Sequence, residues 1–491
     1  MHRQTIEYCT PMLFNSLEFA IFLPIVFLLY WFVFGRLLSH SPNQLRWQNL
    51  FLLTASYVFY GWWNWRFLIL IVVTSLVSWG SALAIGKTYQ TGLKKTWLSI
   101  SIVLNLAILG VFKYCNFFVS SFCHLFGLDD SSYVLHIMLP VGISFYTFQA
   151  LSYSIDVYRG KIAATKDPVS FFTYIAFFPQ LVAGPIERAT NLLPQFQQKR
   201  LFSYSDAVEG MQRILWGLFK KILIADNCAW YVNMEWADYA RQNGSTLVLT
   251  AFLFAIQIYC DFSGYSDIAI GTARLFGFRL RENFKTPYFS RNVAEFWKRW
   301  HISLNTWFVD YVYIPLGGSR EGKVRTILNT FVIFLLSGLW HGANWTYVTW
   351  GLYHALLFVP LIVLNRTKTY QDTPACRQFP QILLTFLLVV IGWIVFRAPS
   401  LQDAWMFVYN MVIHIDHGEP FYIHSEYMRR LCVSLFILFS VEWIGRKGTR
   451  PLALSALHLP AWAKAVCYTA LVQLIFAWGR FEYTQFIYFQ F

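Results

Sequence analysis

The stretch FLLSGLWHGANWTYVTWGLYHALL, from Phe334 to Leu357, places a histidine inside a segment that is apolar enough to lie in lipid. His341 stands within it and is followed by Gly342, Ala343 and Asn344. An ionisable side chain within a membrane segment is costly and is by default a candidate functional residue. The stretch therefore indicates a helical membrane protein with a site inside it.

The composition of the whole chain supports this fold class. Hydrophobic residues make up 57% of the 491 residues and charged residues only 13%, whereas soluble domains average about a quarter charged. Apolar blocks such as 67–85 and 97–112 are long, and a helix needs about 20 apolar residues to cross the hydrocarbon. The short alternating strands of a β-barrel are absent from the sequence. We therefore predict an all-α polytopic membrane protein and exclude a soluble enzyme.

The apolar blocks predict the spans individually. They lie at residues 17–34, 50–63, 67–85, 97–114, 133–155, 207–230, 247–270, 327–341, 346–364, 382–396, 431–444 and 462–478. Block 171–182 is shorter and ends in PQLVAGPIER, which favours a re-entrant or interfacial segment. No soluble domain or fixed-period repeat interrupts the pattern. We expect one membrane-embedded domain over residues 1–491, with the first block retained as a helix and the start at Met1 or Met12 left open.

Charge is distributed unevenly among the loops. The chain has 39 Lys and Arg against 25 Asp and Glu, a net charge of +14. Basic residues gather in loops 36–47, 87–95, 158–200, 366–377 and 446–450, and acidic residues in the loops between them, at Asp129, Asp130, Glu235, Asp238, Asp416, Glu419 and Glu426. The positive-inside rule places the basic loops in the cytoplasm and both chain ends outside. Membrane lipids then account for the positive charge, and we expect no nucleic-acid partner.

The segment 271–325 breaks the apolar pattern by interleaving charged and aromatic residues. Seven basic residues lie between Arg274 and Arg299, opposed only by Glu282 and Glu295. One interpretation is an amphipathic surface segment whose cations lie among lipid headgroups. The other is a basic cytoplasmic or re-entrant groove for an anionic acyl carrier, because guanidinium groups bind phosphate well. The candidate donor-binding residues are Arg274, Arg279, Lys298 and Arg299.

His341 has possible supporting groups on a continuous helix. Ser337 lies one turn before it and Asn344 three residues after it, so both would share its face and hold the ring. Gly338 and Gly342 leave room for close packing or for a substrate. The structural alternative is a hydrogen-bonded core histidine, and the functional one is a general base in a cavity.

Other candidate motifs carry less chemistry. His354 is expected to be structural, and His301, in FWKRWHISLN, is by itself an interfacial histidine. DFSGYSD, from Asp261 to Asp267, lacks the order of a nucleophile elbow and is expected to bend a helix and bury hydrogen bonds. Neither an HExxH motif nor a carboxylate at ligand spacing accompanies the histidines, so we expect no metal site.

Several motifs together resemble a known family. RNVAEFWKRWHISLNTWFVDYVYIPLGG and the quoted histidine stretch are similar to membrane-bound O-acyltransferases. MLFNSLEFAIFLPIVFLLYW, PVGISFYTFQALSYSIDVYRG, FFPQLVAGPIER, DFSGYSDIAIGTARLFGF and the ending FIYFQF resemble the bacterial branch, which includes alginate and peptidoglycan O-acetyltransferases and the D-alanine transfer protein of teichoic acids. The resemblance spans nearly the whole chain, and the chain length and the FIYFQF tail favour the alginate-like branch.

The resemblance implies a fold of about 11–13 transmembrane helices with re-entrant helices around a central tunnel. It implies that His341 is the catalytic histidine and that His301 occupies the family's second characteristic polar position. It also implies an acyl donor reached from the cytoplasm and an acceptor reached from outside. We expect the donor to be acetyl-coenzyme A and the enzyme to hold no bound cofactor. In the extracytoplasmic tail 480–491, Tyr488 is the only hydroxyl among the last six residues, Phe486 to Phe491, and is either an aromatic anchor or an acyl relay activated by a base.

These expectations combine into one function with two rivals. We expect the protein to transfer an acetyl group across a bacterial cytoplasmic membrane to an extracytoplasmic polysaccharide. The transfer is either direct or passes through a secreted or periplasmic acyltransferase partner. The first rival is D-alanyl transfer to teichoic acid. The second is a non-enzymatic transporter of a glycan precursor, although the inverted repeats typical of transporters are not visible.

Overall fold

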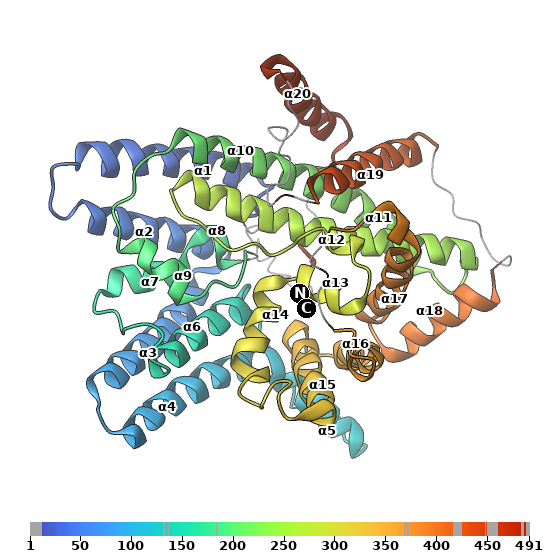
Figure 1. The fold of residues 1–491 in the computed structure, drawn as a ribbon, viewed down its shortest axis with the longest axis horizontal. Coiled ribbons are helices and arrows are strands. Elements are labelled where there is room, and N and C mark those ends of the chain that lie inside the picture. Colours follow the sequence, from blue (N-terminus) through green and yellow to red (C-terminus); the bar gives the residue numbers. More distant parts are fainter. Residues whose placement is uncertain are drawn as a thin grey trace, which may run out of the picture. The chain divides into compact units, whose positions relative to one another are not determined.

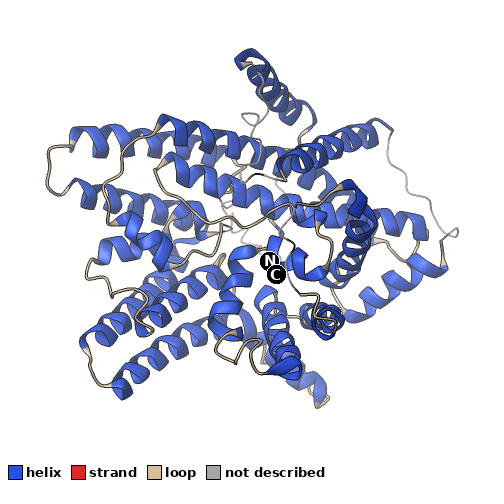
Figure 2. Cartoon of the chain, viewed as in Figure 1, coloured by secondary structure: helices blue, strands red, loops and turns tan. Residues whose placement is uncertain are grey.

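The computed structural model describes residues 12–130, 133–135, 137–182, 184–367, 370, 373–415, 425–446, 448, 460–482 and 486–487. These residues form helices α1 to α20, joined by short 3₁₀ and π-helical turns, and no strand occurs among them (Figure 2). The predicted all-α class is confirmed for this part of the chain.

The chain forms two compact units. The first comprises residues 1–211 and 269–281, and the second comprises residues 212–268 and 282–491. Two of the boundaries between them fall within α10 (Tyr204–Leu218) and α12 (Gly244–Leu275), and the third lies between Arg281 and Glu282.

The first unit contains the N-terminal helices. They are α1 (Leu17–Leu28), α2 (Gln44–Asn64), α3 (Leu68–Lys87), α4 (Thr91–Leu109), α5 (Cys115–Leu125), α6 (Ile143–Tyr158), α7 (Pro168–Ala176), α8 (Phe178–Leu181) and α9 (Ala189–Phe196). Helix α3 packs against α4 and α6, and α2 packs against α7 (Figure 1). Small polar residues join these helices, as where Asn105 donates to Ser78 at 3.0 Å and Ser101 contacts Ser154 at 2.7 Å.

The second unit contains the remaining helices. They are α11 (Asp226–Ala237), α13 (Val293–Arg299), α14 (Ile302–Phe308), α15 (Gly322–His341), α16 (Trp345–Val363), α17 (Phe379–Arg397), α18 (Leu401–Ile413), α19 (Ser425–Gly445) and α20 (Ala461–Trp478). Helices α15 and α16 approach so closely that a Cβ added at Gly338 would lie 2.2 Å from the carbonyl oxygen of Tyr347. A Cβ at Gly351 would likewise lie 2.3 Å from the carbonyl oxygen of Phe334. Glycine is required at both contacts.

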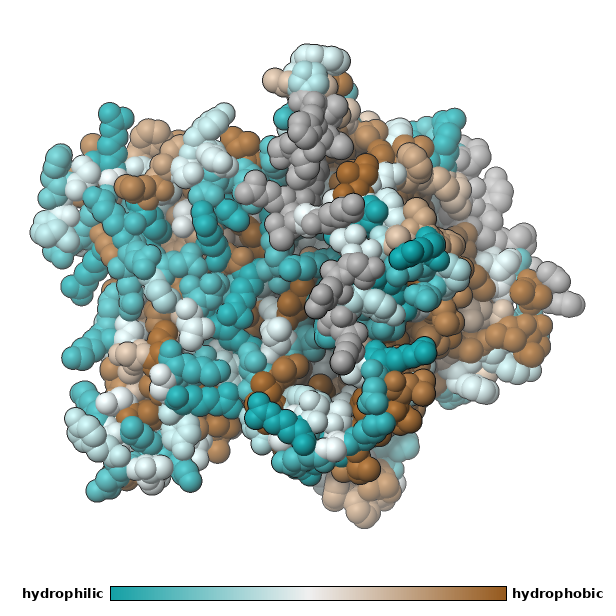
Figure 3. Space-filling model, in the orientation of Figure 1, coloured by the Kyte–Doolittle hydropathy of each residue, from teal (hydrophilic) through white to brown (hydrophobic). Residues whose placement is uncertain are grey.

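The described helices have the length and surface of membrane-spanning segments. Eight helical stretches are long and apolar enough to cross a bilayer. They are Leu17–Leu37, Gln44–Lys87, Thr91–Leu125, Gly244–Leu275, Gly322–His341, Trp345–Val363, Cys376–Arg397 and Ala461–Trp478. Hydrophobic side chains exposed on α17 and α18 include Leu384, Leu387 and Trp405, and Figure 3 shows brown surface where these helices lie. The chain is a multi-pass membrane protein, and the predicted orientation of its loops stays a prediction.

Several predicted span boundaries differ from the structure. Helix α6 begins only at Ile143, because Pro140 cannot donate a hydrogen bond and Gly142 adopts a left-handed φ of 73°. The short block 171–182 forms two helices, α7 and α8, separated at Phe177. Helix α18 was not predicted, since charged and polar residues dilute its apolar pattern. These differences shift or add individual helices and leave the fold class unchanged.

Candidate active site

His301 lies in the turn between α13 and α14 and is held there by its backbone and its ring. Its φ of 43° is left-handed, which is unusual for a residue with a side chain. The ring nitrogen Nδ1 lies 3.1 Å from the side-chain oxygen of Asn283. The same oxygen accepts the Ser303 hydroxyl at 2.9 Å, while the Asn283 amide donates to Ser266 at 3.2 Å. Asn283 thus fixes the ring orientation, with Nδ1 as the donor and Nε2 as the basic nitrogen.

The surroundings of His301 favour the neutral imidazole. The residue is 1% exposed, and this burial lowers the pKa of His301 to about 3. The rings of Phe262 and Trp340 contact it at 4.7 and 5.6 Å between centroids. His301 is therefore neutral near pH 7 and presents a lone pair rather than a positive charge.

His341 is the last residue of α15 and is 3% exposed. Its ring is surrounded by Trp340, Trp350 and Phe396, with centroids 5.1, 5.1 and 5.4 Å away. The close packing of α15 on α16 determines this position, since Trp350 belongs to α16. An imidazole in such an aromatic enclosure is shielded from water and held in one place.

The structure brings the two sequence-predicted histidines together. The ring centroids of His301 and His341 are 6.3 Å apart, and Trp340 contacts both rings. Both residues belong to the second unit. Two buried imidazoles at this spacing can serve two reacting groups at once, one as a base and one as a hydrogen-bond partner.

The predicted supports of His341 are placed differently from expectation. Helix α15 ends at His341, and Gly342 is extended, so the prediction that Asn344 shares its helical face is wrong. Asn344 instead caps α16, accepting from the backbone of Thr346 at 3.1 Å and donating to the carbonyl of Pro399 at 2.9 Å. Ser337 does lie one turn before His341 and is buried.

The glycines beside His341 serve helix packing. A Cβ at Gly342 would lie 2.1 Å from the ring of Tyr347, so the space that the sequence left open for a substrate is filled by α16. His354 is fully buried and accepts a hydrogen bond from the indole of Trp297 at 3.3 Å. That geometry suits the structural role expected for it.

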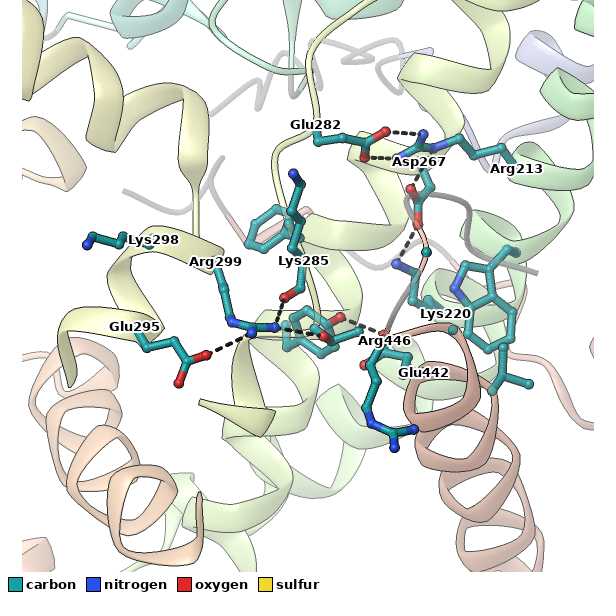
Figure 4. Close-up of a pocket in the computed structure, with 17 residues that line it drawn as sticks. Arg213, Lys220, Asp267, Glu282, Lys285, Glu295, Lys298, Arg299, Glu442 and Arg446 are labelled. Atoms are coloured by element: carbon teal, nitrogen blue, oxygen red, sulfur yellow. Dashed lines mark hydrogen bonds and ion pairs between the residues drawn. The ribbon is translucent and has the colours of Figure 1, made fainter. Parts of the chain in front are cut away.

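A charged cavity of about 370 Å³ lies in the same unit. Its walls carry six basic and four acidic side chains, together with Tyr259, Phe284 and other groups (Figure 4). The basic ones are Arg213, Lys220, Lys285, Lys298, Arg299 and Arg446, and the acidic ones are Asp267, Glu282, Glu295 and Glu442. Phe284 links the cavity to His301, because its ring stacks on that of His301 with 6.4 Å between centroids.

Ion pairs hold much of this wall rigid. Arg213 binds Asp267 through Nε at 2.9 Å and Glu282 through its two terminal guanidinium nitrogens, and Lys220 binds Asp267 at 2.6 Å. Arg299 reaches Glu295 at 2.8 Å (Figure 4). Burial raises the pKa of Glu295, but hydrogen bonds from Arg291 and the charge of Arg299 outweigh burial and leave that pKa below its usual range. The cavity wall is therefore a preorganised ionic surface with a basic excess.

The four candidate donor-binding residues fall into two groups. Lys298 and Arg299 line the cavity. Arg274 and Arg279 belong to the first unit, where Arg274 pairs with Asp206 at 2.9 Å and Arg279 with the same carboxylate at 3.6 Å. Acidic residues of α10 thus pair with Arg274 and Arg279, and neither arginine lines this cavity.

Several site residues were missed by sequence reasoning. Asn283, which holds His301, lies in an ordinary-looking loop and carries no sequence signal. Lys220 and Glu442 interrupt apolar blocks, and charges at such positions are functional candidates. Glu442 accepts the Tyr259 hydroxyl at 2.6 Å on the cavity wall.

The motif DFSGYSD lies within the unbroken helix α12 and is almost entirely used for buried contacts. Ser263 and Asp267 bind Lys220, at 2.8 and 2.6 Å. A Cβ at Gly264 would lie 2.9 Å from the carbonyl oxygen of Gly217, so glycine permits close packing there. The expected burial of hydrogen bonds is present, without a break in the helix.

Tyr488 lies outside the described residues. The two residues before it, Phe486 and Ile487, are described and are buried at 0% and 2% exposure. Among the described residues, no group of three His, Cys, Asp or Glu side chains is placed to hold a metal ion.

The fold and the site together define a multi-pass helical membrane protein in which two buried histidines lie beside an ionic cavity. Residues 100–397 match the membrane-bound O-acyltransferase family, a range that includes both histidines. The chain belongs to this family and is an O-acyltransferase, which removes the transporter alternative.

Individual relatives cover most of the chain. It is 43% identical to the probable alginate O-acetylase AlgI of Pseudomonas aeruginosa, over 80% of this chain and 74% of the relative. It is 35% identical to the peptidoglycan O-acetyltransferase of Helicobacter pylori, over 82% and 80%. It is 29% identical to the teichoic acid D-alanyltransferase of Bacillus subtilis, over 52% and 68%.

Proposed function

We propose that this O-acyltransferase acetylates an extracytoplasmic polysaccharide, taking the acetyl group from cytoplasmic acetyl-coenzyme A across a bacterial cytoplasmic membrane. The names of the relatives support the acceptor class, because alginate and peptidoglycan are both polysaccharides outside the cytoplasm. The higher identity and coverage of the O-acetylases favour acetyl over D-alanyl.

One observation carries the proposal: two buried histidines with centroids 6.3 Å apart, joined through Phe284 to a cavity with a basic excess. Coenzyme A carries several phosphate groups at one end and a narrow arm that ends in the thiol at the other. A cavity with a basic excess, whose wall residue Phe284 stacks on His301, suits such a carrier better than it suits a neutral sugar.

The donor end of the reaction uses the cavity wall. Lys285 and Lys298 offer ammonium groups to the phosphates of the donor, while the ion pairs of Arg213 and Arg299 keep the wall in shape. The arm of the donor passes Phe284, and His301 accepts one of its amide N–H groups at Nε2. Asn283 fixes the tautomer that this contact requires.

The acceptor end uses His341 as a general base. His341 takes the proton of the acceptor hydroxyl as the hydroxyl oxygen attacks the thioester carbonyl. The tetrahedral intermediate then expels the sulfur, so that a C–O bond forms, the C–S bond breaks, and the histidine proton goes to the leaving thiolate. The aromatic enclosure of Trp340, Trp350 and Phe396 excludes water, which would otherwise hydrolyse the thioester.

The first acceptor is either the sugar hydroxyl or the phenol of Tyr488. In the second route Tyr488 carries the acetyl group and passes it to the polysaccharide or to a secreted or periplasmic acyltransferase. A phenol has a pKa of about 10 and needs a base, a role that His341 fills in both routes.

The experiment that tests the function uses inside-out membrane vesicles supplied with acetyl-coenzyme A labelled in the acetyl group. Label on polysaccharide, or on the protein itself, is the expected result. Absence of label, together with D-alanine transfer when a charged carrier protein is supplied instead, would replace acetylation by the D-alanyl alternative.

A further inference from the structure

A buried charged cluster in the second unit has no part in the chemistry described above. The ammonium of Lys221 lies 2.8 Å from a carboxylate oxygen of Asp226 and 2.8 Å from one of Asp261. These three side chains are 1%, 1% and 4% exposed. Burying ions is costly even when they are paired, so such a cluster in a membrane protein calls for a function.

The cluster binds the C-terminal segment. The second carboxylate oxygen of Asp261 accepts the backbone N–H of Ile487 at 2.8 Å. The ring of Phe486 lies 4.2 Å from that of Tyr265, one helical turn after Asp261 on α12. Lys221 also lies 5.5 Å from the Tyr265 ring, within reach of a cation–π contact. One hydrogen bond to a carboxylate and one aromatic contact therefore hold two consecutive residues near the chain end.

The same turn of α12 borders the histidine site. Phe262, next to Asp261, contacts Phe486 with 6.0 Å between ring centroids and His301 with 4.7 Å. Helix α12 thus presents one face to the C-terminal segment and the adjoining face to His301. The chain end is seated one aromatic ring away from the proposed site.

We infer that Lys221 and Asp261 form a latch that seats the C-terminal segment beside the His301 site, making Asp261 a positioning residue for the tail. The inference rests on the proposed function for its purpose, because Tyr488 directly follows Ile487 in the sequence. Its geometry is independent of that function. Lys221 fixes one oxygen of Asp261 and so orients the other toward the tail backbone.

Asp226 provides a matched control. Asp226→Ala and Asp261→Ala each remove one of the two carboxylates that bind Lys221, but only Asp261 contacts Ile487. General damage from an unbalanced buried cation should therefore affect both variants, whereas release of the tail should occur in one.

The test places a reporter on the tail of the full-length protein by the substitution Ile487→Cys. Membranes are treated with N-ethylmaleimide, and modification at position 487 is followed by mass spectrometry of the C-terminal peptide, which separates it from the native cysteines. We expect slow labelling in the otherwise unchanged protein and with Asp226→Ala, and labelling about tenfold faster or more with Asp261→Ala. Equal labelling in the two aspartate variants, or no increase with Asp261→Ala, would overturn the latch.

Two further measurements keep the result decisive. If the alanine variants do not accumulate, Asp261→Asn and Asp226→Asn keep the side-chain volume and are compared in the same way. Acetyl transfer is measured in membranes that contain the same aspartate variants with the native Ile487. Faster labelling with unchanged transfer would leave the latch in place and remove the catalytic role of the tail, whereas unchanged labelling would remove the latch whatever the activity.

Discussion

The imidazole rings of His301 and His341 lie 6.3 Å apart, although one residue directly precedes α14 and the other ends α15. Asn283 holds the first ring by a hydrogen bond, and an aromatic enclosure holds the second. The two histidines therefore differ in environment, which suits different roles in one reaction.

Asn283 is predicted to be a positioning residue. Asn283→Ala removes the acceptor of His301 Nδ1 and should lower acetyl transfer about 10- to 100-fold, because the ring then loses its fixed tautomer. Asn283→Asp should restore much of the activity and shift its pH profile, since a carboxylate also accepts from Nδ1 but favours the charged ring. Ser303→Ala, which removes another donor to the same oxygen, is the control. An equal loss in the alanine and aspartate variants would contradict the prediction.

The burial of His301 predicts a specific response to acid. The pKa of His301 is about 3 in the folded protein, below its ordinary value of 6.5. Between these values the unfolded chain binds more protons, so stability falls as the pH drops below about 6.5. His301→Gln should remove on the order of 1–2 kcal/mol of the loss between pH 7 and pH 5. Thermal unfolding of both proteins in detergent measures this, and parallel losses would contradict it.

The contact between α15 and α16 should tolerate no side chain at Gly338. Gly338→Ala should destabilise the protein by on the order of 1–3 kcal/mol, because the new methyl group would overlap the Tyr347 carbonyl. Gly80→Ala is the matched control, since a Cβ at that helical glycine meets nothing within 4 Å. The two variants are compared by thermal unfolding in detergent, where a melting temperature for Gly338→Ala equal to that of Gly80→Ala would count against the packing argument.

The cavity lysines should affect donor binding more than turnover. Lys285→Glu should raise the KM for acetyl-coenzyme A about two- to tenfold, because an exposed charge contributes modestly, and should change kcat little. Lys323→Glu, on the exposed start of α15 and away from the cavity wall, provides the control. A change in kcat alone would show that this cavity does not bind the donor.

The Tyr488 relay makes a separate prediction. Tyr488→Phe keeps the aromatic ring and removes the hydroxyl, so the relay route predicts a loss of acetyl transfer to polysaccharide of about 100-fold or more. Tyr483→Phe, in the same C-terminal stretch, should have little effect. Unchanged acetylation by Tyr488→Phe would leave direct transfer as the route.

The sequence allowed prediction of the class and the histidines but not of their surroundings. Apolar blocks predict membrane-spanning helices, because insertion into lipid depends on the residues of each block alone. His341 was identified because a histidine inside such a block is unusual. The helix end at His341 was missed because nothing local distinguishes Gly342 as an end from a glycine within a packed helix. The contacts of Asn283, Lys221 and Asp261 depend on segments far apart in the chain, and a single sequence does not specify such pairings.

The most direct test of the account is acetyl transfer by His341→Gln in inside-out vesicles with labelled acetyl-coenzyme A, at matched protein level. Glutamine is close in size but is not a base, so we predict a loss of at least about 100-fold, while His354→Gln, at the Trp297 contact, retains most of the activity. Transfer at the wild-type rate by His341→Gln would contradict the assignment of His341 as the general base.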